Sequence, residues 1–335
     1  MNEFESDIQK YLNKLLNEFK KCKSKKKYIE LLNIYHIIED IINNVDMNVN
    51  YSKEFEYELK KYNIDRYDKL YELKFIDNYD VMYNYNLVFS NIYRNIPNER
   101  INNMEYQETI DLNDTVEMVQ EFFKYFSEDM YNYFNKQILD NGLLVISDKI
   151  EGGRTYLSNH LLPPYSLINP TLCAKDYVVI IHETVHSYIR NRLRYITFEQ
   201  LNTMLVNNLE EVYPIFTELC AIKFAQEKNM LNELDKYKKA VYSSLYKYLE
   251  KYNTNIIDSN IKDYVKNERY SYGYLLAYRY FDIYNNNQEE AKQKILKLSL
   301  ESPYHDKKFL LNNYGNNQFD LLNTTKLINS IKLSV

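Results

Sequence analysis

The stretch VVIIHETVHSY, residues 178–188, joins an apolar run to two histidines that are four positions apart. Four positions make about one turn of an α-helix, so both imidazoles are expected on the same face. The apolar run predicts that this helix, over residues 175–193, is buried, which is the rigid support that a metal site needs. The chain has only five histidines, and two of them fall at this spacing.

The residues from His182 to His186 match H-E-x-x-H, a pattern in which both histidines bind zinc and the glutamate activates a water molecule. Glu183 lies about 100° round the helix from His182, within reach of the position where water would bind. We therefore expect a hydrolase that acts on peptide bonds, with one Zn²⁺ ion on the histidines and Glu183 as general base.

A catalytic zinc needs a third protein ligand and one open position. The longer metzincin pattern is absent, because Ile189 and Arg192 stand where its glycine and its last histidine would be. Glu218 lies in the apolar segment 214–221, where a buried carboxylate needs a partner, and it is the expected third ligand. The other candidates are downstream glutamates: Glu199, Glu210, Glu211 and Glu227.

Two of those candidates, Glu210 and Glu211, follow Asn207-Asn208 and are expected at a solvated helix end. A second role is open to Glu211. It can accept a hydrogen bond from the outer N–H of a ligand imidazole, a contact that metal sites usually contain.

Outside this stretch the sequence favours a mainly α fold with a small β-sheet near the active site. Glycine and proline are scarce, at 5 and 6 of 335 residues, and apolar residues recur at helical spacing. Short apolar runs at 143–146 and 165–168 predict two strands, with Gly152-Gly153 as a turn and Pro163-Pro164 placing the second strand at a sheet edge. A boundary near 136 would separate an N-terminal helical region, 1–136, which forms part of a cleft wall or a reduced lid, from a catalytic region, 137–335.

Helix ends and lengths follow from the same periodicity. Segments around 8–19 and 29–42 are predicted as helices, and a third runs from about 67 to 96 before Pro97. Asp114 is the expected N-cap of the next helix. After Pro214, which suits the first turn of a helix, further helices are expected over 231–252, 270–286 and 288–299.

Charge and composition limit the other possibilities. With 42 basic and 47 acidic residues the net charge is −5, so we expect no nucleic-acid partner. The basic run at 20–27 is typical of a solvated helix end. No apolar stretch is long enough to cross a membrane, and the acidic N-terminus lacks the features of a signal peptide. Three distant cysteines suggest no disulfide framework, so a cytoplasmic location is expected.

Three blocks of the sequence make it similar to the thimet oligopeptidase and oligoendopeptidase F family of zinc peptidases. They are PYSLIN at 164–169 ahead of HETVHS, IFTEL at 215–219, and YSYGYL at 270–275. The resemblance covers about 140–285. The chain departs from the family in having Val185 where a glycine is usual, no histidine ahead of the tyrosine block, and a longer gap between His186 and Glu218.

The resemblance implies a helical metallopeptidase fold and a role for each block. The strand of the first block would bind an extended peptide by strand addition. Glu218 would be the third zinc ligand, and Tyr274, or less directly Tyr272, would stabilise the oxyanion. The residues expected to contact substrate are Tyr165, Leu167, Asn169 and Tyr270.

Three functions are compatible with these residues. The first is an oligopeptidase that cleaves short peptides, and the second is a dedicated endopeptidase for one protein or propeptide. The third is a non-catalytic, zinc-stabilised peptide-binding protein, which Glu183 argues against because a structural site has no use for it. The sequence does not predict an oligomeric state.

Overall fold

The computed structural model describes residues 3–47, 49, 51–61, 92–96, 106–254 and 261–314. Within these ranges the chain is mainly helical, as expected. The helix predicted over 67–96 lies almost wholly outside the described residues. The helices are α1 Glu3–Lys21, α2 Lys25–Asn44, α3 Lys53–Lys60, α5 Leu112–Phe126, α6 Glu128–Tyr133, the π-helix η2 Phe134–Leu139, α7 Ala174–Arg192, α8 Phe198–Asn207, α9 Val212–Glu227, α10 Leu234–Thr254, α11 Ile261–Asn286, α12 Gln288–Glu301 and α13 Lys307–Asn313.

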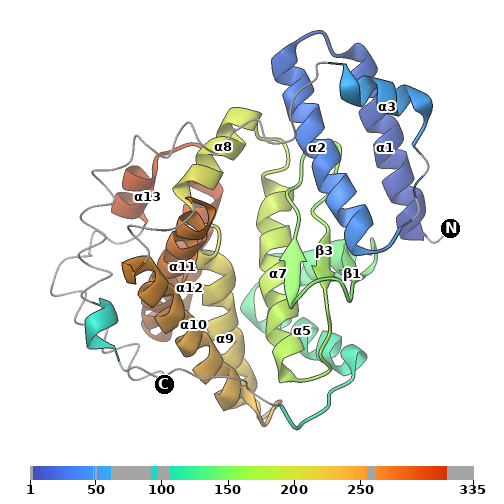
Figure 1. Ribbon diagram of the computed structural model, residues 1–335. Helices are drawn as coiled ribbons and strands as arrows, with labels where there is room; N and C mark the ends of the chain where they lie inside the picture. Colours follow the sequence, from blue (N-terminus) through green and yellow to red (C-terminus); the bar gives the residue numbers. More distant parts are fainter. Residues whose placement is uncertain are drawn as a thin grey trace.

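Helix α7 occupies the centre of the arrangement (Figure 1). It packs against α9 and α5 and also against strands β2 and β3. Figure 1 shows α1–α3 beside the sheet on one side of α7, and the helices from α9 to α13 on the other. One apolar core includes residues from both sides of position 136. The residues ahead of His182 explain the central place of α7, because Val178, Ile180 and Ile181 are fully buried.

The sheet has three short strands in the order β1-β3-β2: β1 Leu144–Ile146, β2 Gly153–Thr155 and β3 Ser166–Ile168. Strand β1 pairs in parallel with β3, and β2 pairs antiparallel with it. The prediction that the 165–168 segment forms an edge was wrong, because β3 is the central strand. Gly153, predicted to lie in a turn, is instead the first residue of β2, one of the two edge strands.

The position of β3 changes the interpretation of the first sequence block. Leu167 is fully buried, and the ring of Tyr165 is buried against Phe4 and Tyr11 of α1. The side-chain amide of Asn169 donates to the backbone oxygen of Ile150, 2.8 Å away. Leu167 and the ring of Tyr165 are therefore part of the core and are not free to contact a peptide as the sequence suggested, whereas the partly buried side chain of Asn169 supports the loop ahead of β2.

Helix ends differ in detail from the predictions. Helix α5 begins three residues earlier than expected, with Asp111 rather than Asp114 as its N-cap, and the Asp111 side chain accepts from the N–H of Asn113. Helix α8, which the sequence analysis missed, has a capping box formed by Thr197 and Gln200. It ends at Asn208, which adopts a left-handed conformation with φ of 58°. A short turn then leads into α9, where Pro214 lies in the first turn as expected.

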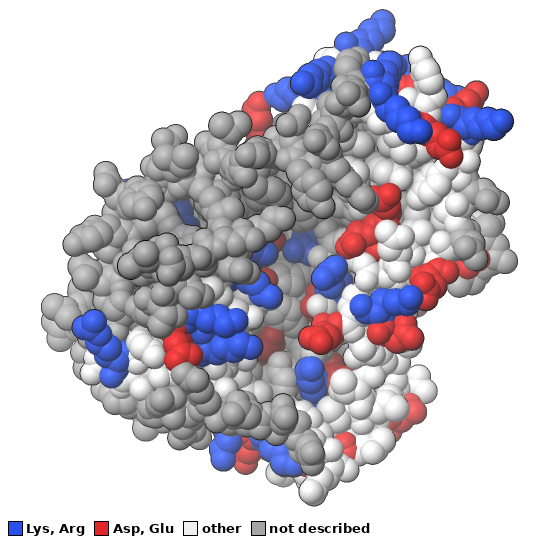
Figure 2. All heavy atoms as spheres, in the orientation of Figure 1, with Lys and Arg blue, Asp and Glu red and all other residues white. Residues whose placement is uncertain are grey.

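One face of the molecule is hollowed. Figure 2 shows a depression in this face, between α7 with its sheet on one side and α10 and α11 on the other, with acidic and basic side chains on its walls. No described helix combines the length and apolar character needed to cross a bilayer.

Truncating Leu167 tests whether it belongs to the core or to a substrate site. Leu167→Ala removes a fully buried side chain from the central strand, so we expect the free energy of unfolding to fall by about 2–5 kcal/mol. Urea denaturation measures this change. The control is Arg154→Ala, directly across in β2 and exposed, which loses surface interactions with Asp40 and Tyr156 and no buried apolar group. An unchanged unfolding midpoint for Leu167→Ala would contradict the assignment to the core.

Candidate active site

The two histidines of the H-E-x-x-H pattern converge as the sequence predicted. Both project from the same face of α7, and their Nε2 atoms are 3.1 Å apart. His186 is buried and His182 is nearly so. Two ring nitrogens held this close in a mostly dry environment need a shared proton or a cation between them.

A carboxylate completes the cluster, and it comes from Glu211. Its Oε2 atom lies 3.2 Å from Nε2 of His182 and 3.4 Å from Nε2 of His186. Although Oε2 is buried, it makes no hydrogen bond of acceptable geometry with any described group. His182, His186 and Glu211 form a group that could hold a metal ion.

The separations of these three atoms suit zinc. Tetrahedral zinc with bonds of about 2.0–2.2 Å needs ligand atoms about 3.3–3.5 Å from one another. The three observed distances are 3.1, 3.2 and 3.4 Å. Two imidazoles and one carboxylate are also the ligand types of a common class of catalytic zinc site, which leaves a fourth position open. The residues therefore fit the ion that the sequence predicted.

Glu218, the expected third ligand, lies on the other side of the His182 ring. Its Oε1 atom contacts Nδ1 of His182, and its Oε2 atom accepts from the hydroxyl of Tyr237 at 3.4 Å. A proton on Nδ1 leaves the lone pair on Nε2, the nitrogen that faces Glu211. The two carboxylates thus occupy places opposite to those predicted, and Glu211 is buried rather than at a solvated helix end.

The charges in this cluster favour a cation between the ring nitrogens. Burial lowers the pKa of His182, but the carboxylates of Glu218 and Glu211 outweigh it, and the net pKa is well above the ordinary value. Burial raises the pKa of Glu211, yet the neighbouring imidazoles of His186 and His182 bring it well below its usual range. The same fields that stabilise a bound proton stabilise a metal ion.

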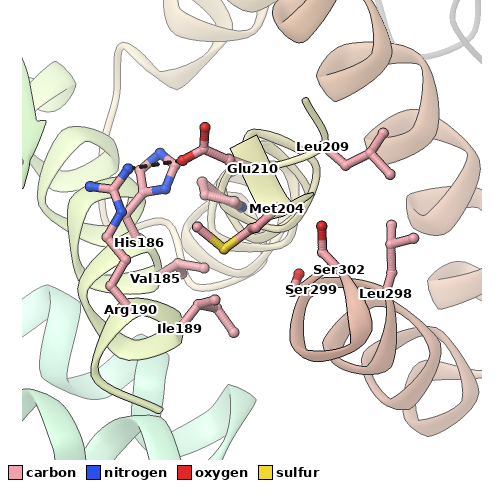
Figure 3. A pocket seen from close by; sticks show the side chains of 11 residues that line it. Val185, His186, Ile189, Arg190, Met204, Leu209, Glu210, Leu298, Ser299 and Ser302 are labelled. Atoms are coloured by element: carbon pink, nitrogen blue, oxygen red, sulfur yellow. Dashed lines mark hydrogen bonds and ion pairs between the residues drawn. The ribbon is translucent and has the colours of Figure 1, made fainter. Parts of the chain in front are cut away.

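The neighbouring carboxylate, Glu210, is held by two arginines. Its oxygens lie 3.1 Å from the Arg190 guanidinium and 3.4 Å from that of Arg269. Burial raises the pKa of Glu210, but the positive charges of Arg269 and then Arg190 outweigh that effect. The net pKa of Glu210 is below the ordinary value. Figure 3 shows the Arg190–Glu210 pair beside His186, above a pocket with a largely apolar wall. The turn that carries Glu211 is thereby fixed to α7 and α11.

The side chain of Glu183 contacts strand β2. The hydroxyl of Thr155 donates to its Oε2 atom at 2.6 Å. A Cβ atom on Gly153 would lie 2.5 Å from Cγ of Glu183, so only glycine fits at this point of the strand. Thr155 was not predicted as a site residue, because β2 has only three residues and is too short to show a strand period. The one signal near it in the sequence was the Gly152-Gly153 pair, which was predicted to be a turn.

The three tyrosines of the third block do not share a face of α11. Tyr272 is buried under the ammonium group of Lys307, which lies 4.5 Å from its ring centroid. Tyr270 and Tyr274, four residues apart, both stack near Tyr248. A role for Tyr272 in catalysis does not fit, because residues two apart on a helix point to nearly opposite sides.

Tyr270 and Tyr274 respond to different carboxylates. The charge of Glu211, followed by burial, raises the pKa of Tyr270, with a smaller contribution from Glu183. Burial and then Glu218 raise the pKa of Tyr274 well above its usual range. The charge of Glu211 thus acts most strongly on Tyr270, and that of Glu218 on Tyr274. Gly273 lets α11 approach α9, since a Cβ there would be 2.7 Å from Cβ of Glu211.

Comparisons with known proteins give only distant matches. No protein-family model and no curated protein sequence matches the chain. Similar solved structures include a protein of Bacillus anthracis str. Ames assigned as an oligoendopeptidase F, at 16% identity and a TM-score of 0.49, with 92% of this chain and 62% of that one covered. Another is a protein of Chlamydophila abortus assigned as a peptidase, at 12% identity and a TM-score of 0.48, with 98% and 62% covered.

A third similar structure is a PZ peptidase A with an inhibitor, at 14% identity and a TM-score of 0.42, with 92% of this chain and 64% of that one covered. The chain thus spans less than two thirds of the length of each of these proteins. TM-scores below 0.5 do not by themselves establish a common fold or activity.

Charge-neutral variants separate the roles of the two carboxylates. Glu211→Gln replaces a charged ligand oxygen by a neutral amide, a much weaker ligand for zinc, so we expect specific zinc binding to be lost. Glu218→Gln removes the charge behind Nδ1 of His182 but no atom that faces the metal, so we expect zinc affinity to fall by about 10–100-fold. Competition with a chromogenic chelator measures both affinities. If Glu218→Gln abolishes binding while Glu211→Gln retains most of it, the sequence-based assignment was right and the one from geometry is wrong.

Proposed function

We propose that this chain is a zinc-dependent metallopeptidase that hydrolyses peptide bonds of oligopeptides. The observation that carries the proposal is the convergence of two Nε2 atoms and a carboxylate oxygen at 3.1–3.4 Å. A structural zinc site is normally closed by four protein ligands, whereas only these three converge among the described residues. Glu183, next to one of the ligands, is the residue that a hydrolytic site needs in addition.

In this proposal His182, His186 and Glu211 hold one zinc ion, and Glu218 orients His182. When bound, zinc lowers the pKa of a water molecule towards about 7 and polarises the scissile carbonyl. Glu218 also adds negative charge behind the imidazole, which makes Nε2 a better donor to the metal. The position of Tyr237 against the second oxygen of Glu218 keeps that carboxylate in place.

Glu183 acts as the general base and then as the general acid. Its carboxylate accepts a proton from the attacking water and delivers it to the nitrogen of the leaving amine. It is buried, and β2 constrains its side chain through Thr155 and Gly153. A base that is held in one rotamer meets the substrate without first losing conformational freedom.

Tyr270 is the best-placed donor for the oxyanion that develops on the scissile carbonyl. Its raised pKa keeps the phenol protonated, which is the form that donates a hydrogen bond. The charges of Glu211 and Glu183 both act on its hydroxyl, and α11 packs closely against Glu211 at Gly273, which supports this role. Tyr274 remains a positioning neighbour, because it is buried and lies nearer Glu218.

The substrate backbone is proposed to pair with β2, the edge strand, instead of β3. Gly152 and Tyr156, which flank β2, bond to the segment around β3: Gly152 accepts from Asn169, and Tyr156 donates to Tyr165. The backbone groups of Gly153 and Thr155 therefore point away from β3, towards the open edge, where the oxygen of Thr155 already accepts from Arg190. An extended peptide can bond to the backbone of Gly153 and to the N–H of Thr155 by strand addition, a mode that depends on the main chain and reads side chains only weakly.

Neutralising the base tests the proposed reaction. Glu183→Gln keeps the size of the side chain but cannot accept a proton, so we expect hydrolysis of a quenched fluorescent peptide to fall by about 10²–10⁴-fold or more. Zinc affinity should stay at the parent value, because Glu183 is not a ligand. Parent-like hydrolysis by this variant would show that another group is the base.

Conservative tyrosine variants test the oxyanion assignment. Tyr270→Phe deletes one donor and is expected to lower kcat by about 100–1000-fold. Tyr272→Phe is the matched control on the same helix, and it should leave kcat near the parent value because its ring faces Lys307. Steady-state kinetics on the same peptide distinguish the two. A large loss for Tyr272→Phe with none for Tyr270→Phe would reverse the assignment.

A further inference from the structure

We propose that Thr155 is a positioning residue for Glu183: its hydroxyl, presented by the edge strand, holds one carboxylate oxygen so that the other is aimed at the attacking water. The inference rests on the proposed function, in which Glu183 is the base. Neither the H-E-x-x-H pattern nor the three sequence blocks assigns a role to this residue.

The hydroxyl of Thr155 lies at the centre of a small buried group of oxygens. It is 2.6 Å from Oε2 of Glu183, 3.0 Å from the backbone oxygen of Glu183, and 2.7 Å from the hydroxyl of Ser166. A threonine has one proton to donate, and a charged carboxylate at 2.6 Å is its strongest acceptor. Ser166 can donate in turn to the Thr155 oxygen, so that the two hydroxyls polarise one another.

Strand β2 also accommodates the second oxygen, Oε1 of Glu183, because Gly153 has no side chain to occupy that space. A Cβ atom on Gly153 would lie 2.7 Å from Oε1 of Glu183 and 2.5 Å from its Cγ. The carboxylate therefore lies flat against the backbone of β2, with Oε2 bound by Thr155 and Oε1 beside Gly153. One strand thus sets the rotamer of the base from two points.

Strand β2 is itself tied to the metal-binding segment by Arg190. The guanidinium of Arg190 donates to the backbone oxygen of Thr155, and it pairs with Glu210 at 3.1 Å (Figure 3). Glu210 directly precedes the proposed ligand Glu211 in the chain. The position of Thr155 is therefore coupled to that of the ligands, which is what a fixed distance between base and metal requires.

Two substitutions of Thr155 distinguish the contribution of its hydroxyl group from that of its packing. Thr155→Val keeps the volume and loses the hydroxyl, whereas Thr155→Ser keeps the hydroxyl and loses the methyl group. With a quenched fluorescent peptide we expect Thr155→Val to lower kcat by about 10–100-fold with little change in KM, because the base is misplaced and the substrate site is not. Thr155→Ser should restore most of kcat, and chelator competition should give parent-like zinc affinity for both variants.

Thr115→Val is the matched control, since Thr115 is also buried and its hydroxyl bonds at 3.0 Å to the backbone oxygen of Asp111, the N-cap of α5, and to no residue of the candidate site. It should lower the unfolding midpoint and leave kcat unchanged. If Thr155→Val does not fold, Gly153→Ala gives the second test. It retains Thr155 but displaces the carboxylate, and kcat is expected to fall while zinc stays bound.

Parent-like kcat for Thr155→Val or for Gly153→Ala would overturn the proposal. So would a loss for Thr155→Ser as large as that for Thr155→Val, because packing rather than the hydroxyl would then be responsible. Failure of the proposed function has a different signature. In that case Glu183→Gln and the parent enzyme hydrolyse the peptide equally, or neither does, whereas a failed role for Thr155 leaves the loss in Glu183→Gln intact.

Discussion

The contact between Glu218 and Nδ1 of His182 is the constraint on which the candidate site depends. It fixes the tautomer of the ring and turns the Nε2 lone pair towards His186 and Glu211. Without it, a buried imidazole could present either nitrogen, and the three ligand atoms would not share one point. The contact forms only at one axial register of α9 along α7. The position of the metal ligands is therefore a consequence of how these two helices pack.

The buried charges around this contact account for much of the surrounding architecture. Glu210 and Glu211 lie side by side in the turn before α9, and isolated carboxylates there would be costly. The first is paired with Arg190 and Arg269, and the second faces the two imidazoles. Asn208, at the end of α8, accepts from Arg269 and so links the same turn to α11. The polar network orients the turn as well as neutralising it.

Much of this arrangement was predictable from the sequence, and the errors have physical causes. The four-residue spacing of His182 and His186 sets their common face for any helix, so that part of the site followed directly. Glu211 and Glu218 are seven residues apart, about two helical turns, so both face α7. Periodicity cannot show which of the two glutamates lies beside Nε2 of His182, because that depends on the axial position of α9 relative to α7. The unusually long gap from His186 to Glu218 was the one sequence signal in favour of Glu211.

The contrast between local spacing and tertiary packing also explains the errors in predicting the sheet and the tyrosines. Strand β2 has three residues and no apolar alternation, so its pairing with β3 depends on tertiary contacts that a single sequence does not reveal. Helical geometry alone, by contrast, should have separated Tyr272 from Tyr270 and Tyr274.

Anomalous diffraction at the zinc edge from zinc-loaded crystals tests the central claim most directly. We expect one peak about 2.0–2.2 Å from Nε2 of both histidines and from a carboxylate oxygen of Glu211, with Glu218 in contact with Nδ1 of His182 and not with the metal. A peak bonded to Glu218, or no ordered peak between the two imidazoles, would contradict it.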